Sequence, residues 1–222
     1  MQRQKMPAPS KKPDKPPKSE LMPSAQIGVP FNANPDFPDI LVNKYLKPFK
    51  IQGVFETGTY QGGSTCWFAK QVPEVHTLEI NQTYFNANVE RFKQFPNIKA
   101  HLGNSPDGLA YLLAHWDPKK PLCVFLDAHW HDYFPLKDEI LAVARSPMKD
   151  NCFIIIDDAK CPGRPDIPYD SYKGVDISIE HLGAVIQQAI PSAVIEHYAP
   201  PPALAKSRGR ILVYPKAWAA AL

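Results

Sequence analysis

Short runs of apolar residues alternate with longer amphipathic segments from about residue 38 to the end of the chain. Several short runs are apolar at nearly every position, which is typical of strands buried on both faces of a parallel sheet. The predicted strands are VFET (54–57), VHTLEI (75–80), IKAHLG (98–103), LCVFLD (122–127), CFIIID (152–157), AVIEHY (193–198) and RILVYP (210–215). The predicted helices cover 38–48, 63–71, 82–94, 105–115, 136–146 and 177–190.

This alternation of strands and helices predicts right-handed βαβ units in an open sheet with helices on both faces. The segment between the last two predicted strands consists almost entirely of PPPALAKSRG, which has no helical pattern. These two strands are therefore expected to pair antiparallel. We predict a doubly wound, Rossmann-like α/β fold whose seven-stranded sheet is mostly parallel and closes in a C-terminal antiparallel hairpin.

The N-terminal segment differs from this pattern in composition. Residues 1–20 carry a net charge of +4, whereas the whole chain carries +3, so the other 202 residues together carry −1. Lysine and proline dominate the segment, and aliphatic residues are almost absent from it. Such a segment buries too little apolar surface to offset the entropy lost on ordering. We predict a disordered, Lys/Pro-rich arm over residues 1–37 and one domain over residues 38–222.

The chain has no run near the roughly 18 apolar residues that a membrane-spanning helix requires, and its beginning lacks the apolar stretch of a signal peptide. The expectations are a cytoplasmic location and no membrane partner. The four cysteines include no CxxC pair, and two of them adjoin runs that are predicted to be buried strands. Reduced, structural thiols are therefore favoured over a disulfide framework or a zinc site.

A glycine-rich segment, ETGTYQGGST (56–65), follows the first predicted strand. Glycine permits positive φ and a close approach of the backbone to a ligand, and the helix that follows presents free N–H groups. Its E-x-G-x-x-x-G spacing differs from that of dinucleotide-binding folds. The candidate cofactor-binding residues are Glu56, Gly58, Tyr60 and Gly62. The alternative is that the segment is only a tight turn.

The second predicted strand ends at Glu79, twenty-one residues beyond Gly58. A carboxylate at this position can accept both hydroxyl protons of a ribose. The alternative is that Glu79 only places a negative charge at a helix N-terminus. Ser105, after the third strand, has two interpretations of equal weight, a cofactor contact or a helix N-cap with Pro106 at the first helical position.

Acidic residues and histidines follow the fourth and fifth predicted strands. VFLDAHWHD contains Asp127, His129 and His131, and FIIIDDAK contains Asp157 and Asp158. Parallel strands end at one edge of a sheet, so these side chains are expected to converge there. Three Asp side chains predict a site for Mg²⁺ or another divalent cation. The alternative is that they are helix caps or ordinary loop acids.

Taken together, ETGTYQGGST, HTLEIN, FLDAHWH and IIIDDAK resemble class I S-adenosylmethionine (SAM) dependent methyltransferases. Within that class they are similar to the metal-dependent branch of macrocin O-methyltransferases and cephalosporin-hydroxylase-like proteins. The resemblance covers residues 50 to 215, and it leaves the arm unexplained. It implies transfer of a methyl group from SAM to a hydroxyl of a small molecule or saccharide.

The resemblance also implies roles for individual residues. Asp127, Asp157 and Asp158 would hold Mg²⁺, and Asp127 would adjoin the cofactor as well. Asn104 stands where relatives often have an acidic residue beside the adenine, and His129 stands where they often have an acidic general base. His131 competes with His129 for the base role, because imidazole titrates near neutral pH. Either histidine could instead be a metal ligand.

Two further groups of residues are candidates for acceptor binding. The aromatic residues Trp130, Tyr133 and Phe134 could form an acceptor wall, although such residues are more often core. The long segment 159–176 is expected to cover the active site and to select the acceptor. Its candidate residues are Arg164, Asp166, Tyr169 and Tyr172.

Two other function classes remain open from the sequence. One is a binding or regulatory module that retains the SAM pocket without transferring methyl groups. The other is a nucleic-acid methyltransferase guided by the basic arm, which ranks last because the domain itself is slightly acidic and lacks an NPPY-like motif. A nucleic-acid partner is therefore not expected. Dimers are common among similar enzymes, and the sequence does not test a homodimer.

Overall fold

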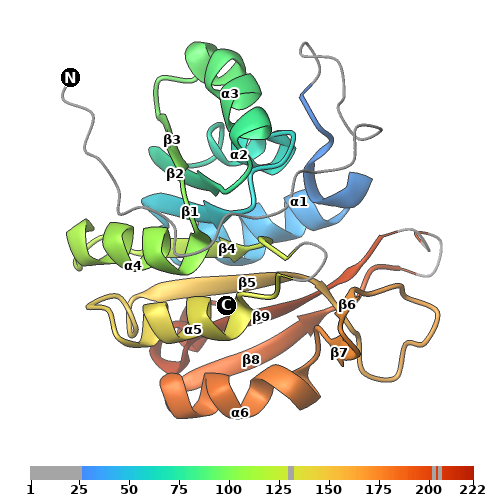
Figure 1. Cartoon of the computed structure of the whole chain (residues 1–222). Helices are drawn as coiled ribbons and strands as arrows, with labels where there is room; N and C mark the ends of the chain where they lie inside the picture. Colours follow the sequence, from blue (N-terminus) through green and yellow to red (C-terminus); the bar gives the residue numbers. More distant parts are fainter. Residues whose placement is uncertain (1–26, 130–132, 202–203, 205–206) are drawn as a thin grey trace.

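The computed structural model describes residues 27–129, 133–201, 204 and 207–222. Its main sheet has seven strands in the order β3-β2-β1-β4-β5-β9-β8 (Figure 1). The strands are β1 (Gly53–Thr57), β2 (Glu74–Glu79), β3 (Ile98–Leu102), β4 (Leu122–Leu126), β5 (Cys152–Ala159), β8 (Ala193–Tyr198) and β9 (Gly209–Pro215). The predicted seven-stranded, Rossmann-like α/β fold is confirmed.

Strands β1 to β5 pair parallel, so their carboxyl ends lie at one edge of the sheet. Strand β9 pairs antiparallel with both β5 and β8, which confirms the predicted C-terminal hairpin. Because β9 runs against β5, the start of β9 lies beside the end of β5, where Gly209 is paired with Ala159. Residues just before and at the start of β9 are thereby brought to the same edge as the ends of the parallel strands.

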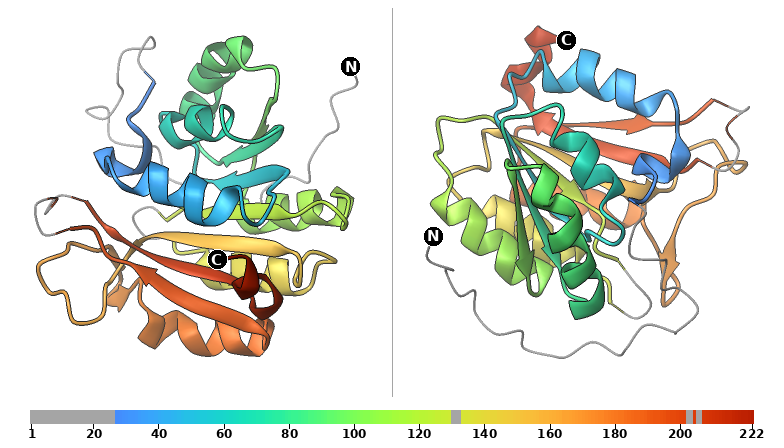
Figure 2. Two further views of the ribbon diagram at one scale, coloured as in Figure 1. Left: turned by 180° about the vertical axis from the view of Figure 1, so that it is seen from behind. Right: turned by 90° about the horizontal axis from the view of Figure 1, so that it is seen from above.

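Helices cover both faces of the sheet (Figure 2). One face is covered by α4 (Ser105–His115), α5 (Leu136–Ala144) and α6 (Ile179–Ala189). The other face is covered by α1 (Phe37–Ile40), which continues into a π-helical segment (Leu41–Leu46), and by α2 (Gly63–Phe68). Helix α3 (Gln82–Arg91) follows β2 and ends in a short 3-10 turn (Phe92–Gln94). Further 3-10 turns lie at Pro30–Ala33 and at Lys216–Ala221.

The alternation of side chains along each strand divides the apolar residues between two cores. In β5, Ile154 and Ile156 face the α4–α6 layer, whereas Phe153 and Ile155 face the α1–α2 layer. The second core is rich in aromatic rings, such as the stacked pair Tyr45 and Phe153 with centroids 5.0 Å apart. Burial of both strand faces explains why the central strands are apolar at nearly every position.

Residues 27–37 were assigned to the arm from their composition, but in the structure they pack against the domain. Phe31 is 2% exposed, and its ring contacts those of Trp67, Phe68 and Phe125 at centroid distances of 4.9 to 5.7 Å. The apolar residues of this stretch therefore find partners that a local count of prolines and charges does not reveal. The predictions for residues 1–26 lie outside the described residues.

Two other elements differ from the sequence-based prediction. Strand β5 continues through Asp157 and Asp158 to Ala159, with a bulge after Ile156. The segment 159–176 contains a small hairpin of β6 (Ser171–Tyr172) and β7 (Val175–Asp176). Most predicted helices are one to three residues longer than the observed ones, because helix ends carry weaker periodic signals than helix centres.

Candidate active site

The glycine-rich turn after β1 has the backbone geometry that its sequence predicts. Gly58 has φ +82°, and a Cβ atom at this position would lie 2.3 Å from the carbonyl oxygen of Asp127. Gly62 has φ +73° and precedes the first turn of α2. Tyr60, between them, is also left-handed with φ +46°. The turn therefore requires glycine at Gly58 both for conformation and for close contact with the end of β4.

Glu56 lies beneath this turn and is buried. Its carboxylate accepts hydrogen bonds from the hydroxyls of Thr65 and Thr77, the latter over 2.6 Å. Burial raises the pKa of Glu56 to about 7, although the two hydroxyls oppose the shift. The carboxyl group is thus poised between its neutral and charged forms near physiological pH, at the base of the candidate cofactor pocket.

Glu79, at the end of β2, connects the glycine-rich turn to the next loop. Its carboxylate oxygens accept hydrogen bonds from the backbone N–H groups of Tyr60 over 2.8 Å and of Asn81 over 2.7 Å. Burial raises the pKa of Glu79 to about 7, and these N–H groups act in the opposite direction. The structure therefore places Glu79 beside the glycine-rich turn, and its contact with a ribose stays a prediction.

Asn104 and Ser105, at the start of α4, differ from the sequence-based prediction in which one caps the helix and in what their side chains contact. The N-cap of α4 is Asn104, and Ser105 is the first helical residue, so the N-cap interpretation of Ser105 is wrong. The Ser105 hydroxyl is buried and lowers the pKa of the Glu139 carboxyl on α5, a group whose burial raises its pKa to about 7. The side chain of Asn104 bonds to Tyr133 and Asp107.

Residues 28–34, here called the strap, lie across the glycine-rich turn. The N–H of Gly28 donates to the carbonyl oxygen of Gln61 over 3.1 Å. A Cβ atom on Gly63 would come within 2.4 Å of the Gly28 carbonyl oxygen, so the two backbones are in direct contact. At the other end, the Asn34 amide donates to the Tyr198 hydroxyl over 2.9 Å. This element was not predicted from the sequence, because the composition of residues 1–37 indicates an arm.

The strap and the turn enclose a pocket of about 130 Å³ at the carboxyl edge of the sheet. Its walls are the strap, the turn at 58–64, Glu56, Asp127 and Asp157. Ligand sites in open α/β sheets lie at this edge. Of the predicted cofactor-binding residues, the pocket lining includes Glu56, Gly58, Tyr60 and Asp127, whereas Gly62, Glu79, Asn104 and Ser105 lie outside its lining.

A second group of polar side chains adjoins this pocket. Asp127, His129 and Asp158 each offer one ligand atom, and these atoms all lie within 4.8 Å of one another. The Nε2 atom of His129 is 3.3 Å from Asp158 Oδ2 and 3.6 Å from Asp127 Oδ1. It is also 3.8 Å from Oδ2 of Asp170, which comes from the segment 159–176. We call Asp127, His129, Asp158 and Asp170 the acid–histidine cluster.

The charges in the acid–histidine cluster shift the pKa values of its carboxyl groups in opposite directions. Burial and the negative charges of Asp157 and Asp158 raise the pKa of Asp127 well above its ordinary value. Burial also acts to raise the pKa of Asp158, but the hydrogen bond from His129 and the charge of Arg208 outweigh it, and the pKa of Asp158 is lowered. His129 and Arg208 therefore stabilise the ionised form of Asp158, whereas burial and its acidic neighbours oppose ionisation of Asp127.

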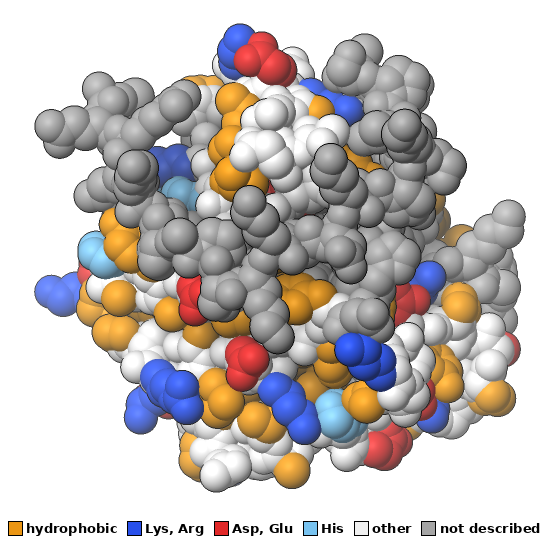
Figure 3. Space-filling model, in the orientation of Figure 1, with side chains coloured by type: hydrophobic (Ala, Val, Ile, Leu, Met, Phe, Trp, Pro, Cys, Tyr) orange, Lys and Arg blue, Asp and Glu red, His pale blue; other side chains and the backbone are white. Residues whose placement is uncertain are grey.

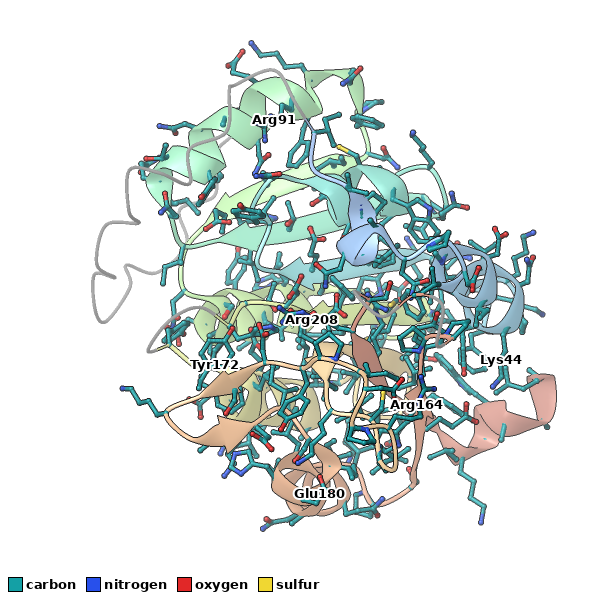
Figure 4. All side chains as sticks on the ribbon, turned by 90° about the vertical axis from the view of Figure 1, so that its right-hand side faces the viewer. Lys44, Arg91, Arg164, Tyr172, Glu180 and Arg208 are labelled. Carbon is teal, nitrogen blue, oxygen red and sulfur yellow. The ribbon has the colours of Figure 1, made fainter. Side chains whose placement is uncertain are left out.

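Arg208 binds the acid–histidine cluster from the side of β9. Its guanidinium forms ion pairs with Asp170 and, over 3.3 Å, with Asp158. Figure 4, a view from one side of the molecule, labels Arg208 and Tyr172, which come from the segment before β9 and from β6. The Tyr172 hydroxyl also donates to Asp170 over 3.0 Å. Asp170 and Arg208 were not predicted from the sequence.

Asp157, a predicted metal ligand, does not belong to this cluster. Its carboxylate pairs with Arg210 Nε over 2.9 Å, and both side chains are buried. Alternation along β5 places Asp157 on the side of the α1–α2 layer, where Arg210 lies over the ring of Phe37 at 4.0 Å. Asp158 lies within the bulge between Ile156 and Ala159, has a left-handed backbone with φ +55°, and bonds instead to His129. The structure thus separates two residues that are adjacent in the sequence.

The remaining candidates differ in position. His131 and Trp130 lie outside the described residues. Phe134 stacks on Tyr172 with ring centroids 5.6 Å apart, next to His129. The guanidinium of Arg164 pairs with Asp166 on the surface. Tyr169 lies under the ammonium group of Lys160. Phe134 and Tyr172 are therefore the predicted acceptor residues that border the acid–histidine cluster.

Basic side chains do not form a continuous area on the face shown in Figure 3, where described Lys and Arg residues alternate with acidic and apolar ones. Among the described residues, no helix is both long and apolar enough to cross a bilayer.

The sequence matches no protein-family model and shows no significant similarity to a curated protein. Solved structures do resemble it. A Klebsiella pneumoniae protein provisionally assigned as an O-methyltransferase aligns with a TM-score of 0.58 and 18% identity over 89% of this chain and 84% of its own. The O-methyltransferase TomG from Streptomyces achromogenes, solved with SAM, aligns with a TM-score of 0.56 and 16% identity over 86% and 82%.

The methyltransferase PaMTH1 from Podospora anserina, solved with S-adenosylhomocysteine, aligns with a TM-score of 0.53 and 16% identity over 81% of this chain and 77% of its own. At these identities the likeness concerns the fold, and it extends over most of both chains in each pair. The chain therefore shares its seven-stranded, Rossmann-like fold with these three methyltransferase structures.

Proposed function

We propose that this chain is a SAM-dependent O-methyltransferase that acts on a hydroxyl group of a small molecule or saccharide. The observation that carries the proposal is the direct contact between two sites at one sheet edge. The pocket beneath the strap includes Asp127 in its wall, and Asp127 is also a member of the acid–histidine cluster. A methyl donor in the first site and a hydroxyl acceptor at the second would meet at this residue.

The residues of the pocket suit the two ends of SAM. Glu56 and the backbone at Gly58 would hold the methionine end, where a carboxylate can pair with the amino group of SAM. Glu79, whose oxygens already accept two N–H groups, retains lone pairs for a ribose hydroxyl. The adenine would then extend toward Asn104 at the start of α4. The strap would exclude water from the reacting groups.

The reaction would be an in-line displacement. The acceptor oxygen attacks the methyl carbon of SAM, the bond between that carbon and sulfur breaks, and the products are a methyl ether and S-adenosylhomocysteine. The acceptor hydroxyl proton passes to a base of the protein. Because the sulfonium already activates the methyl group, the protein mainly has to align the oxygen and assist its deprotonation.

The acid–histidine cluster fits a divalent cation, since three of its ligand atoms converge within 4.8 Å. Asp127 and Asp158 would hold the ion. When bound, a divalent cation would orient the acceptor hydroxyl and lower its pKa. Phe134 and Tyr172 would contact the apolar part of the acceptor. The candidate bases are His129 and His131, and alanine variants of each would separate their contributions.

Isothermal titration with SAM tests this proposal, with and without added Mg²⁺, on the wild-type chain and on Asp127→Asn. A second assay measures transfer of a labelled methyl group to a panel of small hydroxyl compounds and saccharides. We expect SAM binding in the wild type, and transfer that depends on metal and on Asp127. Absence of SAM binding would exclude the function. SAM binding without transfer to any acceptor would instead support a non-catalytic SAM-binding module.

A further inference from the structure

We infer that His129 is a direct ligand of the cation and that the acid–histidine cluster therefore takes a first-row transition-metal ion in preference to Mg²⁺. The role of the cation in catalysis rests on the proposed function. The choice of ligand and of metal ion does not. It replaces the ligand set of three Asp side chains that the sequence suggests with two carboxylates and one imidazole.

The position of His129 favours a ligand role over that of a base. Its side chain is 2% exposed, and Nε2 lies 3.3 to 3.8 Å from oxygens of Asp158, Asp127 and Asp170. An imidazole surrounded in this way has little access to an acceptor hydroxyl. In the absence of an ion, Nε2 donates to Asp158 Oδ2. A cation bound at Nε2 would displace this proton to the other ring nitrogen, Nδ1, which has no hydrogen-bond partner among the described residues.

The distances within the cluster suit metal coordination. Two adjacent ligands of an octahedral ion at about 2.1 Å are separated by about 3.0 Å. The Nε2 atom of His129 is 3.3 Å from Asp158 Oδ2 and 3.6 Å from Asp127 Oδ1. Small side-chain movements would therefore bring all three atoms to coordination distance. The oxygen of Asp170, at 3.8 Å from the same nitrogen, is close enough to serve as a fourth ligand.

The charges of the aspartates and arginines at this edge of the sheet would be balanced by one divalent cation. The edge of the sheet holds four aspartates, Asp127, Asp157, Asp158 and Asp170, and two arginines, Arg208 and Arg210, that pair with them. If all four carboxyl groups are ionised, two negative charges have no cationic partner from these arginines. Burial makes such unpaired charges unfavourable, so a divalent ion would stabilise the ionised cluster.

The donor set determines which ion is preferred. Mg²⁺ favours a shell made only of oxygen ligands and keeps several of its waters, whereas imidazole is a good ligand for first-row transition metals. Asp157, which would complete a set of three carboxylates, is already neutralised by Arg210. The cluster therefore offers nitrogen where a magnesium site would offer oxygen. Mn²⁺ is the strictest probe, because it binds most weakly in the transition-metal series.

Titration calorimetry on the full chain, without SAM, compares Mn²⁺ with Mg²⁺. For the wild type we expect Mn²⁺ to bind at least roughly tenfold more tightly than Mg²⁺, because imidazole discriminates between the two ions. The His129→Asp variant should lose most of this difference, since it restores an all-oxygen set. His115→Ala, which removes an exposed histidine on α4, is the matched control and should retain it.

Pulsed electron paramagnetic resonance of bound Mn²⁺ provides a direct readout. Coupling to an imidazole nitrogen is expected in the wild type and in His131→Ala, and it should disappear in His129→Asp. Circular dichroism checks that each variant is folded. If His129→Asp does not fold, His129→Asn, which keeps a polar side chain of similar size, takes its place in both measurements, and loss of the nitrogen signal is again expected.

Equal affinity for Mg²⁺ and Mn²⁺, no binding of either ion, or a nitrogen signal that depends on His131 would each overturn the inference. None of these results depends on SAM, so they are separate from failure of the proposed function. A chain that binds Mn²⁺ through His129 but not SAM would refute the methyltransferase proposal alone.

Discussion

Arg210 shows how one side chain organises the buried part of the site. Its guanidinium is fully buried, pairs with Asp157 over 2.9 Å and lies 4.0 Å from the ring centre of Phe37. It also donates to the carbonyl oxygen of Phe31 over 3.3 Å. One residue of β9 thereby connects the end of β5, the strap and the start of α1. A buried charge in this position is stable only while its partner is present.

Replacing Arg210 with methionine should therefore destabilise the protein strongly. The variant keeps an unbranched apolar stem but leaves the Asp157 carboxyl buried without its cation, which we expect to cost about 3–5 kcal/mol in the free energy of unfolding. Urea denaturation measures the change. Arg164→Met, which removes an arginine from a surface pair with Asp166, is the control and should change stability little. Similar losses of stability in both variants would show that the buried ion pair contributes no more to the free energy of unfolding than the surface pair does.

If the proposed function is right, Glu56 should make SAM binding sensitive to pH. Its pKa is raised to about 7 by burial, so the carboxyl group passes from mostly neutral to mostly ionised between pH 6 and pH 8. Only the ionised form attracts the positively charged amino group of SAM. The dissociation constant for SAM should therefore fall as the pH rises through this range, by about three- to tenfold.

Isothermal titration at pH 6, 7 and 8 measures this dependence. In Glu56→Gln the affinity should change less with pH, because the amide does not ionise. Glu90→Gln, a change in an exposed residue of α3, should behave like the wild type. A wild-type affinity that is constant from pH 6 to pH 8 would contradict the role given to Glu56.

At the level of elements, the strap is notable for its backbone. Phe31, Asn32 and Ala33 are three consecutive left-handed residues with φ of 52°, 55° and 58°, and none is glycine. Such a conformation costs roughly 1–2 kcal/mol per residue. The strap is held against this cost by the buried ring of Phe31 and by hydrogen bonds at Asn34 and from Asn32 to Asp158, the latter over 2.8 Å. Packing thus sets its conformation.

Replacing Ala33 with glycine should relieve part of this strain. The Ala33 side chain is exposed, so little contact is lost, and we expect a gain of up to about 1 kcal/mol, or a rise of about 2–4 °C in Tm. Thermal unfolding followed by circular dichroism gives the result. Ala110→Gly, at an exposed position within α4, should instead lower Tm, because glycine is a poor helix former. A lower Tm for Ala33→Gly would show that the strap is not strained.

On the scale of the whole molecule, the sheet separates two apolar cores, and all four cysteines lie in buried positions. None of the four forms a disulfide in the structure. Burial raises the pKa of the Cys66 thiol to about 11 and that of Cys152 to about 12. These thiols therefore remain protonated and poorly reactive while the fold is intact.

The native protein should react slowly with an aromatic disulfide reagent at pH 8, because thiolates are rare and access is blocked. In 6 M guanidinium chloride, a concentration on the order of that used to unfold most domains, all four thiols should react at once. Absorbance of the released thiolate measures both rates. Rapid reaction of one or more thiols in the folded protein would show that a cysteine is more accessible than the structure indicates.

Local patterns in the sequence were sufficient to predict the seven strands, most helices and the antiparallel end of the sheet. Periodicity reports which faces of an element are buried, and this information is local. The same holds for Gly58, Glu79 and Asp127, because residues at the ends of parallel strands must meet at one edge. Period-two alternation could also have warned that Asp157 and Asp158 point to different layers.

The partners of these residues depended on tertiary structure. Arg208 and Arg210 reach the site because β9 runs antiparallel to β5, and this pairing joins residues about fifty positions apart. Asp170 and the strap belong to segments whose composition is typical of loops, so their position at the site was not predictable from composition. Contacts over such separations depend on how the whole chain packs, and no local pattern encodes them. The sequence thus identified the sheet edge that holds the candidate site, and the packing of distant segments decided which side chains meet there.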